Sequence, residues 1–369
     1  MKTIAFYLPQ YHSIPENDEW WGNGFTEWVT VKKAKPLFKG HVQPEIPLNN
    51  DYYSLMDSAT QEKQSELALR FGIDAFCYYH YWFDGKLLLE KPMENMLRNP
   101  KIEISFCVSW ANESWARTWD GKEKKILIQQ NNNETISAWE KHYRYLAVFF
   151  KDKRYLKEDN KPILLIYKPH LIENISEMIL FWNKLAKDDG YNGIYWGVQH
   201  PSACHNRNII ELFDFGVEFE PLYTDYEMEG ERAELHGVDR MIYGFKHPKW
   251  LMSKIKKRIY GLPSIRDYDE VWNQILSRKP LNSKMCPGAF PAWDNTPRKG
   301  RNGISFFKAT PEKFKEYIYR QYKRATDVYK SNYLFINAWN EWGEGAHLEP
   351  DEYNKFGYLE AVKNARDGK

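Results

Sequence analysis

The sequence predicts an α/β protein of the (β/α)8 TIM-barrel class, with a parallel eight-stranded barrel at its centre, and three observations support this. Short apolar runs and amphipathic helical segments alternate eight times along the 369 residues. The runs are continuously apolar, which is typical of parallel strands covered on both faces. Polar and aromatic residues gather where the runs end. In such a barrel the active site lies at the C-terminal face, so we expect it there.

Eight apolar runs are the expected strands. Each is too short to be a helix of its own, and a turn or a polar stretch follows it. In chain order they are 3–8, 73–79, 103–109, 162–167, 193–198, 215–219, 285–290 and 333–336.

Helix start and stop signals separate these strands. Asp57 or Ser58 can cap a helix that Gly72 ends, and Thr310 followed by Pro311 is typical of a helix start. The expected helices are 57–71, 86–97, 136–150, 175 up to Gly190, 267–276, 310–328 and 351–365.

We expect a single domain, residues 1–369, that contains two long additions. The loop 12–56 is rich in Trp, Gly and Pro, and so long a loop in a compact domain is usually functional. The insertion at about 221–263 includes a dense basic run, 246–258. We interpret this run as a solvated helix face, with contact to anionic lipid or a lipid-linked glycan as the alternative.

Composition favours a carbohydrate ligand. The formal net charge of +2 gives no sign of nucleic-acid binding. Aromatic residues make up 16% of the chain. Aromatic faces stack on sugar rings, although many of these side chains must fill the core. We therefore expect an oligo- or polysaccharide partner.

Cysteines, histidines and the N-terminus carry weaker signals. None of the four cysteines lies in a Cys-x-x-Cys pair, and Cys77 and Cys107 fall in expected strands, which favours buried thiols and a reducing compartment. The histidines lack metal-ligand spacing, so we expect no metal and no cofactor. There is no apolar signal region, and no stretch approaches the ~20 residues of a membrane span. We expect a cytoplasmic protein without membrane insertion, with a trimmed leader as the alternative.

Two carboxylates follow the eighth expected strand. Glu341 and Glu344 stand three residues apart on a loop that Gly343 and Gly345 interrupt. Charged groups beside a buried strand are destabilising unless they are paired or used. Two carboxylates in different environments can act as base and acid, the pair that glycosidic bond cleavage needs. The structural alternative is that Glu341 caps the backbone and Glu344 begins a surface turn.

Further candidate ligand contacts follow the expected strands on the same face. Together we expect them to bind substrate. They are Tyr11, His12, Trp28, Tyr79, Trp82, Trp110, Asn112, Glu113, Tyr167, His200, Glu218, Glu220, Trp293, Asp294 and Asn340. Glu218 and Glu220 alternate along one strand, so only one is expected to face the barrel interior.

The segment around the two glutamates resembles a known family. Asn-Glu-Trp-Gly-Glu-Gly at 340–345, followed by His347 and Glu349, resembles the E-W-x-E-G segment of glycoside hydrolase family 99, the endo-α-mannosidases. The chain resembles WbsX-like proteins of bacterial polysaccharide gene clusters more closely still. The matching pieces are Leu-Pro-Gln-Tyr-His at 8–12, Gly-Phe-Thr-Glu-Trp at 24–28, Tyr-Tyr-His-Tyr-Trp at 78–82, Ser-Trp-Ala-Asn-Glu at 109–113 and Phe-Pro-Ala-Trp-Asp-Asn at 290–295.

The resemblance implies a retaining glycoside hydrolase that cleaves an α-mannoside-like linkage in a polysaccharide. Glu341 would deprotonate the sugar 2-hydroxyl, which then attacks its own anomeric carbon to give an anhydro sugar. Glu344 would protonate the leaving oxygen and later activate water, so no protein nucleophile is needed. Gly343 stands where endo-mannosidases usually carry histidine, and this departure bears on the mannose specificity.

Two alternatives stay open. WbsX-like proteins are commonly labelled glycosyltransferases, and the basic loop from Arg298 to Arg301 could hold the phosphates of a sugar nucleotide, or an acidic sugar. Asp267 and Asp269 have the Asp-x-Asp spacing of a transferase metal site, but we interpret them as acids at a helix start. The third hypothesis is a non-catalytic glycan-binding barrel. The sugar, its linkage, endo or exo action and the oligomeric state are not specified by the sequence.

Overall fold

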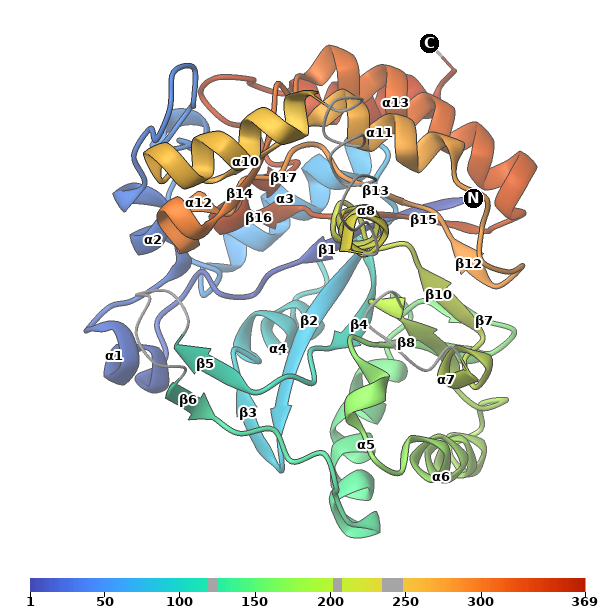
Figure 1. Cartoon of the computed structure of the whole chain (residues 1–369). Helices are drawn as coiled ribbons and strands as arrows, with labels where there is room; N and C mark the ends of the chain where they lie inside the picture. Colours follow the sequence, from blue (N-terminus) through green and yellow to red (C-terminus); the bar gives the residue numbers. More distant parts are fainter. Residues whose placement is uncertain (118–124, 202–207, 234–247, 369) are drawn as a thin grey trace.

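The computed structural model describes residues 1–117, 125–201, 208–233 and 248–368. At its centre is a nearly closed barrel of parallel strands in the order β12-β10-β9-β8-β4-β2-β1-β15-β13 (Figure 1). Their bounds are β1 Lys2–Tyr7, β2 Ala75–Phe83, β4 Ser105–Trp110, β8 Lys161–Ile166, β9 Tyr195–Val198, β10 Phe215–Val217, β12 Met285–Cys286, β13 Gly288–Ala289 and β15 Tyr333–Ile336. Every expected strand is present, and the predicted (β/α)8 barrel is confirmed.

The nine segments fill eight positions because the predicted seventh strand is split. Pro287 separates β12 from β13, and a proline has no N–H to continue a ladder. The half before it, β12, pairs with β10 through Gly216 and Met285. The half after it, β13, pairs with β15 through Gly288 and Phe335. The split seventh strand therefore lies between the sixth and eighth strands, with one half paired to each, and the ring is nearly closed.

Helices alternate with these strands. They are α3 Ser58–Arg70, α4 Lys91–Arg98, α5 Ile136–Phe150, α6 Ile175–Asp188, α7 Asn208–Glu211, α8 Leu222–Ala233, α10 Pro248–Tyr260, α11 Tyr268–Ser277, α12 Thr296–Lys299, α13 Pro311–Arg324 and α14 Gly357–Arg366. As predicted, Asp57 caps α3 and accepts a hydrogen bond from the N–H of Ala59 at 3.0 Å. Thr310 caps α13. The N-termini of both helices are therefore set by a capping side chain that is local in the sequence.

The predicted helix at 86–97 is wrong in its first turn. The second strand continues to Phe83 and pairs with β3 (Lys86–Leu88) as an antiparallel hairpin. Asp84 and Gly85 form its two-residue turn with φ of 49° and 89°, the left-handed geometry that Asp-Gly favours. The last helix also starts later than predicted, at Gly357. The carboxylate of Asp351 instead accepts a hydrogen bond from the N–H of Tyr353 at 2.7 Å and holds a turn.

The loop 12–56 is not structureless. It contains α1 (Pro15–Trp21), α2 (Glu27–Lys33) and a 3-10 turn, Leu48–Asn50. It is tied to the end of β1, because the N–H of Glu27 donates to the carbonyl of Gln10 at 3.1 Å. Short strand pairs lie near the strand ends and loops. They are β5 (Trp115–Arg117) with β6 (Lys125–Ile128), β7 (Lys157–Glu158) with β8, β11 (Ser264–Asp267) with β14 (Ile304–Phe307), and β16 (Asn340–Glu341) with β17 (Ala346–His347).

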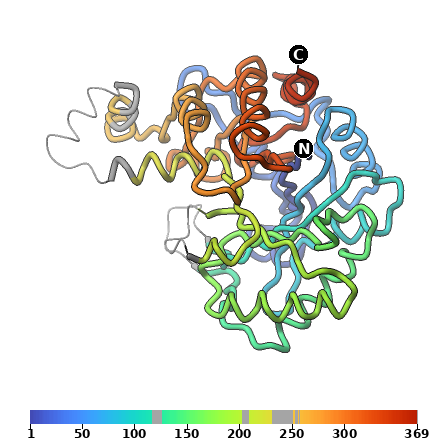
Figure 2. The backbone as a smooth tube through the Cα atoms, turned by 90° about the vertical axis from the view of Figure 1, so that its right-hand side faces the viewer, coloured from blue at the N-terminus to red at the C-terminus, as the bar shows by residue number. Residues whose placement is uncertain are grey.

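The insertion at 221–263 contributes α8 and α10, which project from one side of the molecule (Figure 2). Part of the basic run 246–258 lies outside the described residues. Within the described part, Lys257 and Arg258 are exposed on α10. No helix of the described residues is both long and apolar enough to cross a bilayer.

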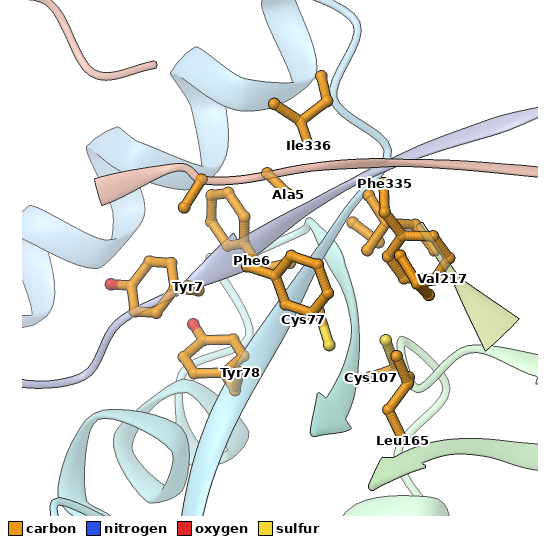
Figure 3. Packing of buried hydrophobic residues seen from close by; sticks show 14 of the residues in the cluster. Ala5, Phe6, Tyr7, Cys77, Tyr78, Cys107, Leu165, Val217, Phe335 and Ile336 are labelled. Carbon is orange, nitrogen blue, oxygen red and sulfur yellow. The ribbon is translucent and has the colours of Figure 1, made fainter. Parts of the chain in front are cut away.

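The barrel core holds the strand ends in place. Side chains from β1, β2, β4, β8, β10 and β15 meet inside it (Figure 3). Phe6 packs edge-on against Phe219, with ring centroids 5.0 Å apart. Cys77 and Cys107 are buried free thiols, as predicted, whereas Cys204 lies outside the described residues. Burying each large apolar side chain contributes about 1.5–3 kcal/mol to stability.

Candidate active site

A cavity of about 360 Å³ opens at the carboxyl ends of the barrel strands. Residues in or just after six of the strands line it. They are Leu8 after β1, Tyr79 in β2, Ala111 after β4, Tyr167 after β8, Phe219 after β10 and Asn337 after β15. This is the face on which the sequence predicts the site.

Glu341 and Glu344 both line this cavity. They belong to a tight hairpin in which Asn340 pairs with His347, and Gly345 takes a left-handed φ of 57° that a glycine adopts without strain. The Glu341 side chain is 8% exposed and that of Glu344 is 22% exposed. The hairpin therefore presents both carboxylates to one space but in different degrees of solvation.

A single guanidinium links the two glutamates to a third. Arg298, on α12, contacts Glu344 from Nη1 at 2.9 Å and hydrogen-bonds Glu341 through Nη2. Its Nε lies 2.8 Å from Oε1 of Glu27, whose side chain is 0% exposed. Each of the three guanidinium nitrogens thus faces a different carboxylate. Such charge-assisted bonds are the strong kind, and they fix the orientation of all four side chains.

The electrostatics of this cluster favour retention of a proton. Three carboxylates and one guanidinium carry a formal charge of −2 in a largely buried position. Burial raises the pKa of Glu341 to about 8; attraction to Arg298 opposes the rise, and repulsion from Glu344 and Glu27 adds to it. Near neutral pH, one proton is therefore held within the cluster.

The close approach of Glu27 and Arg298 explains the glycine at position 343. A Cβ added there would lie 1.8 Å from Oε1 of Glu27 and 2.7 Å from Nε of Arg298. No side chain fits unless the ion pair moves. The histidine that the family 99 pattern carries at this position therefore has no space here.

Three predicted substrate contacts lie behind the glutamates. The Tyr11 hydroxyl donates to the carbonyl of Asn340 at 2.5 Å and accepts from the N–H of Trp342 at 3.2 Å. The Asn340 side chain pairs with both backbone groups of Leu8, at 2.7 and 3.0 Å. The Trp28 ring packs against the rings of Tyr11 and Trp342. None of the three predicted residues lines the cavity; they hold the hairpin that does.

Three other predicted contacts do line the cavity: Tyr79, Glu113 and Tyr167. The Tyr79 hydroxyl accepts a hydrogen bond from Gln199 at 2.8 Å. The Glu113 carboxylate is paired with Lys168, with 2.5 Å between Nζ and Oε1. The structure thus brings these three together with the two glutamates.

Five further predicted residues are absent from the described cavity lining: His12, Trp82, Trp110, Asn112 and His200. The Trp82 ring stacks on buried His142, with centroids 4.4 Å apart. Asn112 bonds to both backbone groups of Lys168, at 2.8 and 2.9 Å, and so joins the ends of β4 and β8.

Glu218 and Glu220 are not in the described cavity lining either. Both reach Nη1 of Arg278, at 2.9 and 2.7 Å, and both side chains are 0% exposed. The strand ends at Val217, so the two residues no longer alternate as strand neighbours do.

Asp294 and Trp293 line a second cavity of about 540 Å³. Oδ2 of Asp294 lies 2.5 Å from Nε2 of His41 and accepts from Gln43 at 2.9 Å. The N–H of Asp294 donates to the carbonyl of Glu344 at 2.6 Å. Asp294 therefore supports the turn that carries Glu344 rather than facing the first cavity.

Sequence reasoning missed Glu27 as a site residue and did not foresee that Arg298 binds carboxylates of the protein. Glu27 lies in the 24–28 segment, where only Trp28 was selected. Arg298 begins the basic loop for which the sequence left phosphate, an acidic sugar or water as alternatives, and its guanidinium binds carboxylates of the protein instead. The described lining also includes Trp21 and Tyr81, aromatic residues that the sequence did not single out.

The described residues contain no group of three or more His, Cys, Asp or Glu side chains placed to hold a metal ion. Asp267 caps α11 and accepts from the N–H of Glu270 at 3.1 Å, while Asp269 pairs with Lys313 at 2.7 Å. The Asp-x-Asp spacing therefore belongs to a helix start, as interpreted from the sequence.

Known proteins of the same fold include glycoside hydrolases. A family 99 endo-α-mannosidase from Bacteroides thetaiotaomicron has a TM-score of 0.54 and 12% identity, over 99% of this chain and 96% of that chain. A protein described as glycoside hydrolase-like has a TM-score of 0.58 and 14% identity, over 99% of this chain and 93% of that chain. At these identities the likeness shows the barrel fold.

Sequence relatives define the family. WxcX proteins of two strains of Xanthomonas campestris pv. campestris are 34% identical over 365 residues, which is 98% of this chain. The chain spans about half the length of these relatives, 49%. A family model described as glycosyltransferase WbsX matches residues 3–362. Because the match covers nearly all of the sequence, the chain belongs to the WbsX family.

Proposed function

We propose that the protein is a retaining glycoside hydrolase that cleaves an α-mannoside-like linkage in a surface polysaccharide through participation of the sugar 2-hydroxyl. The observation that carries the proposal is the pair of cavity-wall carboxylates, Glu341 and Glu344, held by one guanidinium at the barrel mouth. Glycosidic cleavage needs two carboxyl groups of different acidity on either side of the reacting bond.

Glu341 is the base toward the 2-hydroxyl. Burial raises its pKa to about 8, and a base is most effective when its pKa lies near the working pH. Proton removal by Glu341 lets the 2-oxygen attack the anomeric carbon as the bond to the leaving oxygen breaks. Arg298 stays in contact with the carboxylate and stabilises its charged form before the step.

Glu344 is the acid toward the leaving oxygen and later the base toward water. Its side chain is 22% exposed, against 8% for Glu341, so it is the better placed of the two to exchange protons with solvent. Water activated by Glu344 then attacks the anomeric carbon, the bond from that carbon to the 2-oxygen breaks, and Glu341 returns its proton to the 2-oxygen. The two inversions give net retention.

Aromatic residues on the cavity wall support a sugar substrate. Trp21, Tyr79, Tyr81, Trp115 and Tyr167 line the cavity beside the carboxylates. Apolar ring faces next to hydrogen-bonding groups match the two kinds of surface on a pyranose.

The second candidate is a glycosyltransferase, which the description of the WbsX family favours. A sugar nucleotide requires cations for its diphosphate. Among the described residues that line the cavity, Arg298 is the only Lys or Arg, and three carboxylates already surround it. This arrangement supports hydrolysis over transfer from a nucleotide. The third candidate, a non-catalytic glycan-binding barrel, would use the same cavity without chemistry at the glutamates.

A paired product assay tests the three candidates. Surface polysaccharide is incubated with the full chain in water alone or with sugar nucleotides added, and new reducing ends are counted. The variants are Glu341→Gln, Glu344→Gln and, as a matched control, Glu140→Gln, whose carboxylate lies in an exposed ion pair. We expect reducing ends in water alone, lost in the first two variants and kept in the control.

Other outcomes identify the alternatives. Product that forms only with a sugar nucleotide would establish the transferase and overturn the proposal. Binding without product in either arm, unchanged by the two glutamate substitutions, would establish the binding barrel. If a 2-deoxy substrate is cleaved as fast as its parent, participation of the 2-hydroxyl is excluded.

A further inference from the structure

We propose that Glu27 is a positioning residue of this site: through Arg298 it sets how the two cavity-wall glutamates share negative charge and the retained proton. The contacts that support this role do not depend on the reaction, whereas their effect on catalysis rests on the proposed function. Glu27 lies behind Arg298 and is not part of the described cavity lining, so it does not contact substrate.

Glu27 is held in a fixed place. Its backbone N–H begins α2 and donates to the carbonyl of Gln10, just beyond β1. Its side chain is fully buried, with Oε1 2.8 Å from Nε of Arg298 and with no hydrogen-bond partner for Oε2 among the described residues. A buried carboxylate with one unsatisfied oxygen is costly unless it is paired, so Glu27 depends on Arg298.

Arg298 is oriented in turn by Glu27. A guanidinium presents its nitrogens in a rigid planar fork. With Nε held by Glu27 on the closed side, Nη1 and Nη2 point to Glu344 and Glu341 on the open side. The position of the Arg298 guanidinium is therefore set by Glu27, the carboxylate of the three that neither solvent nor substrate reaches.

Gly343 completes the unit. A Cβ at this position would meet Oε1 of Glu27 at 1.8 Å, so the peptide between the two glutamates lies directly against the buried ion pair. Glu27 lies on α2, Arg298 on α12 and Gly343 in the hairpin between β16 and β17, so three separate segments meet here. Their contact requires a glycine at position 343, a requirement that a simple surface ion pair would not impose.

The arrangement predicts effects of opposite sign from two substitutions. Glu27 is a like charge that raises the pKa of Glu341, whereas Arg298 lowers it. Glu27→Gln keeps an oxygen that can accept from Nε but removes the charge, so Glu341 should titrate at lower pH. Arg298→Met removes the positive charge and should move the titration to higher pH. A purely packing role for Glu27 predicts neither direction.

The experiment is a carboxyl ¹³C NMR titration of the full chain labelled at glutamate, with the Glu341 signal identified by its loss in Glu341→Gln. The control is Asp225→Asn, which removes a similar buried carboxylate 2.6 Å from Nε of Arg266, outside the described cavity lining. We expect the Glu341 midpoint to fall by about one pH unit in Glu27→Gln, to rise in Arg298→Met and to stay in the control.

An unchanged midpoint in Glu27→Gln, or a shift in the same direction as Arg298→Met, would overturn the inference. If Arg298→Met does not fold, Arg298→Lys replaces it. Lysine keeps the charge without the planar fork, and a smaller upward shift is expected. The titration requires no turnover, so it tests the positioning role even if the polysaccharide assay fails. Where hydrolysis is found, Glu27→Gln should also move the acid limb of kcat to lower pH by the same amount while KM changes little.

Discussion

Two clusters among the described residues each have one arginine bound to three glutamates, and their comparison shows what makes only one of them a candidate active site. Arg298 binds Glu27, Glu341 and Glu344. In the other cluster Arg278 binds Glu218, Glu220 and Glu227 at 2.7–2.9 Å. Both arginines are largely buried, with side chains 14% and 7% exposed.

The two clusters differ in what surrounds them. Around Arg278, protein groups take the space that a ligand would need: Tyr329 donates to Glu218 at 2.7 Å, and the guanidinium lies 4.6 Å from the ring centre of Tyr223. Around Arg298, two carboxylates face a cavity instead. The pKa of Glu218 is raised to about 7 and that of Glu341 to about 8, in both cases mainly by burial. A raised pKa therefore does not identify the site; access to the cavity does.

The largest expected effect separates the two clusters by activity. Glu344→Gln and Glu341→Gln should each reduce kcat by about 10³-fold, because each removes a proton-transferring group. The melting temperature should change little, since the side chain keeps its shape. Hydrolysis of purified polysaccharide and thermal unfolding measure the two quantities. A fall in activity of less than tenfold in either variant would contradict its role.

The next effect separates them by stability. Arg278→Met leaves the buried Glu218 and Glu220 without their cation, and breaking such a pair costs about 3–5 kcal/mol of unfolding free energy. The activity of the molecules that remain folded should be unchanged. Urea denaturation and active-fraction assays test this. A selective loss of kcat with intact stability would show that this cluster, too, serves the reaction.

A smaller effect tests the contact between position 343 and the ion pair. Gly343→Ala should displace Glu27 and Arg298, lowering kcat by about 10²-fold and stability by about 1–3 kcal/mol. Gly345→Ala in the same hairpin is the comparison, because it meets only the left-handed φ of 57° and Asp294. If adding Glu27→Ala to the Gly343→Ala variant partly restores its kcat and stability, the two positions are coupled. If the effects of the two substitutions on stability simply add, the proposed contact is contradicted.

The smallest effects concern pH. Hydrolysis requires ionised Glu341 together with protonated Glu344, so kcat should follow a bell-shaped pH profile whose acid limb lies near pH 8. Over the acid limb, stability should run the other way. Both Glu218 and Glu341 have folded pKa values above the ordinary 4.5, so the folded state binds more protons than the unfolded state between these values. Their stabilisation is complete below about pH 4.5 and is lost as pH rises through 7 to 8. The melting temperature should decline over this range, less steeply in Glu218→Gln.

The sequence predicted the barrel and its face well because those signals are local. Apolar runs, the caps at Asp57 and Thr310 and the glycine stops depend on neighbours within a few residues. The errors arose where a local signal was overlooked, as with the Asp84-Gly85 hairpin turn. They also arose where the strand pattern was extended too far, as in the sixth strand, which ends at Val217.

The sequence by itself therefore determined the fold class, the face that carries the cavity and the two glutamates on its wall. Tertiary structure alone decided which carboxylates share which arginine. Glu27 and Arg298 are 271 positions apart, and no local periodicity relates them. The barrel brings together loops that leave different strands, and only their packing decides that Glu341 faces a cavity while Glu218 faces protein.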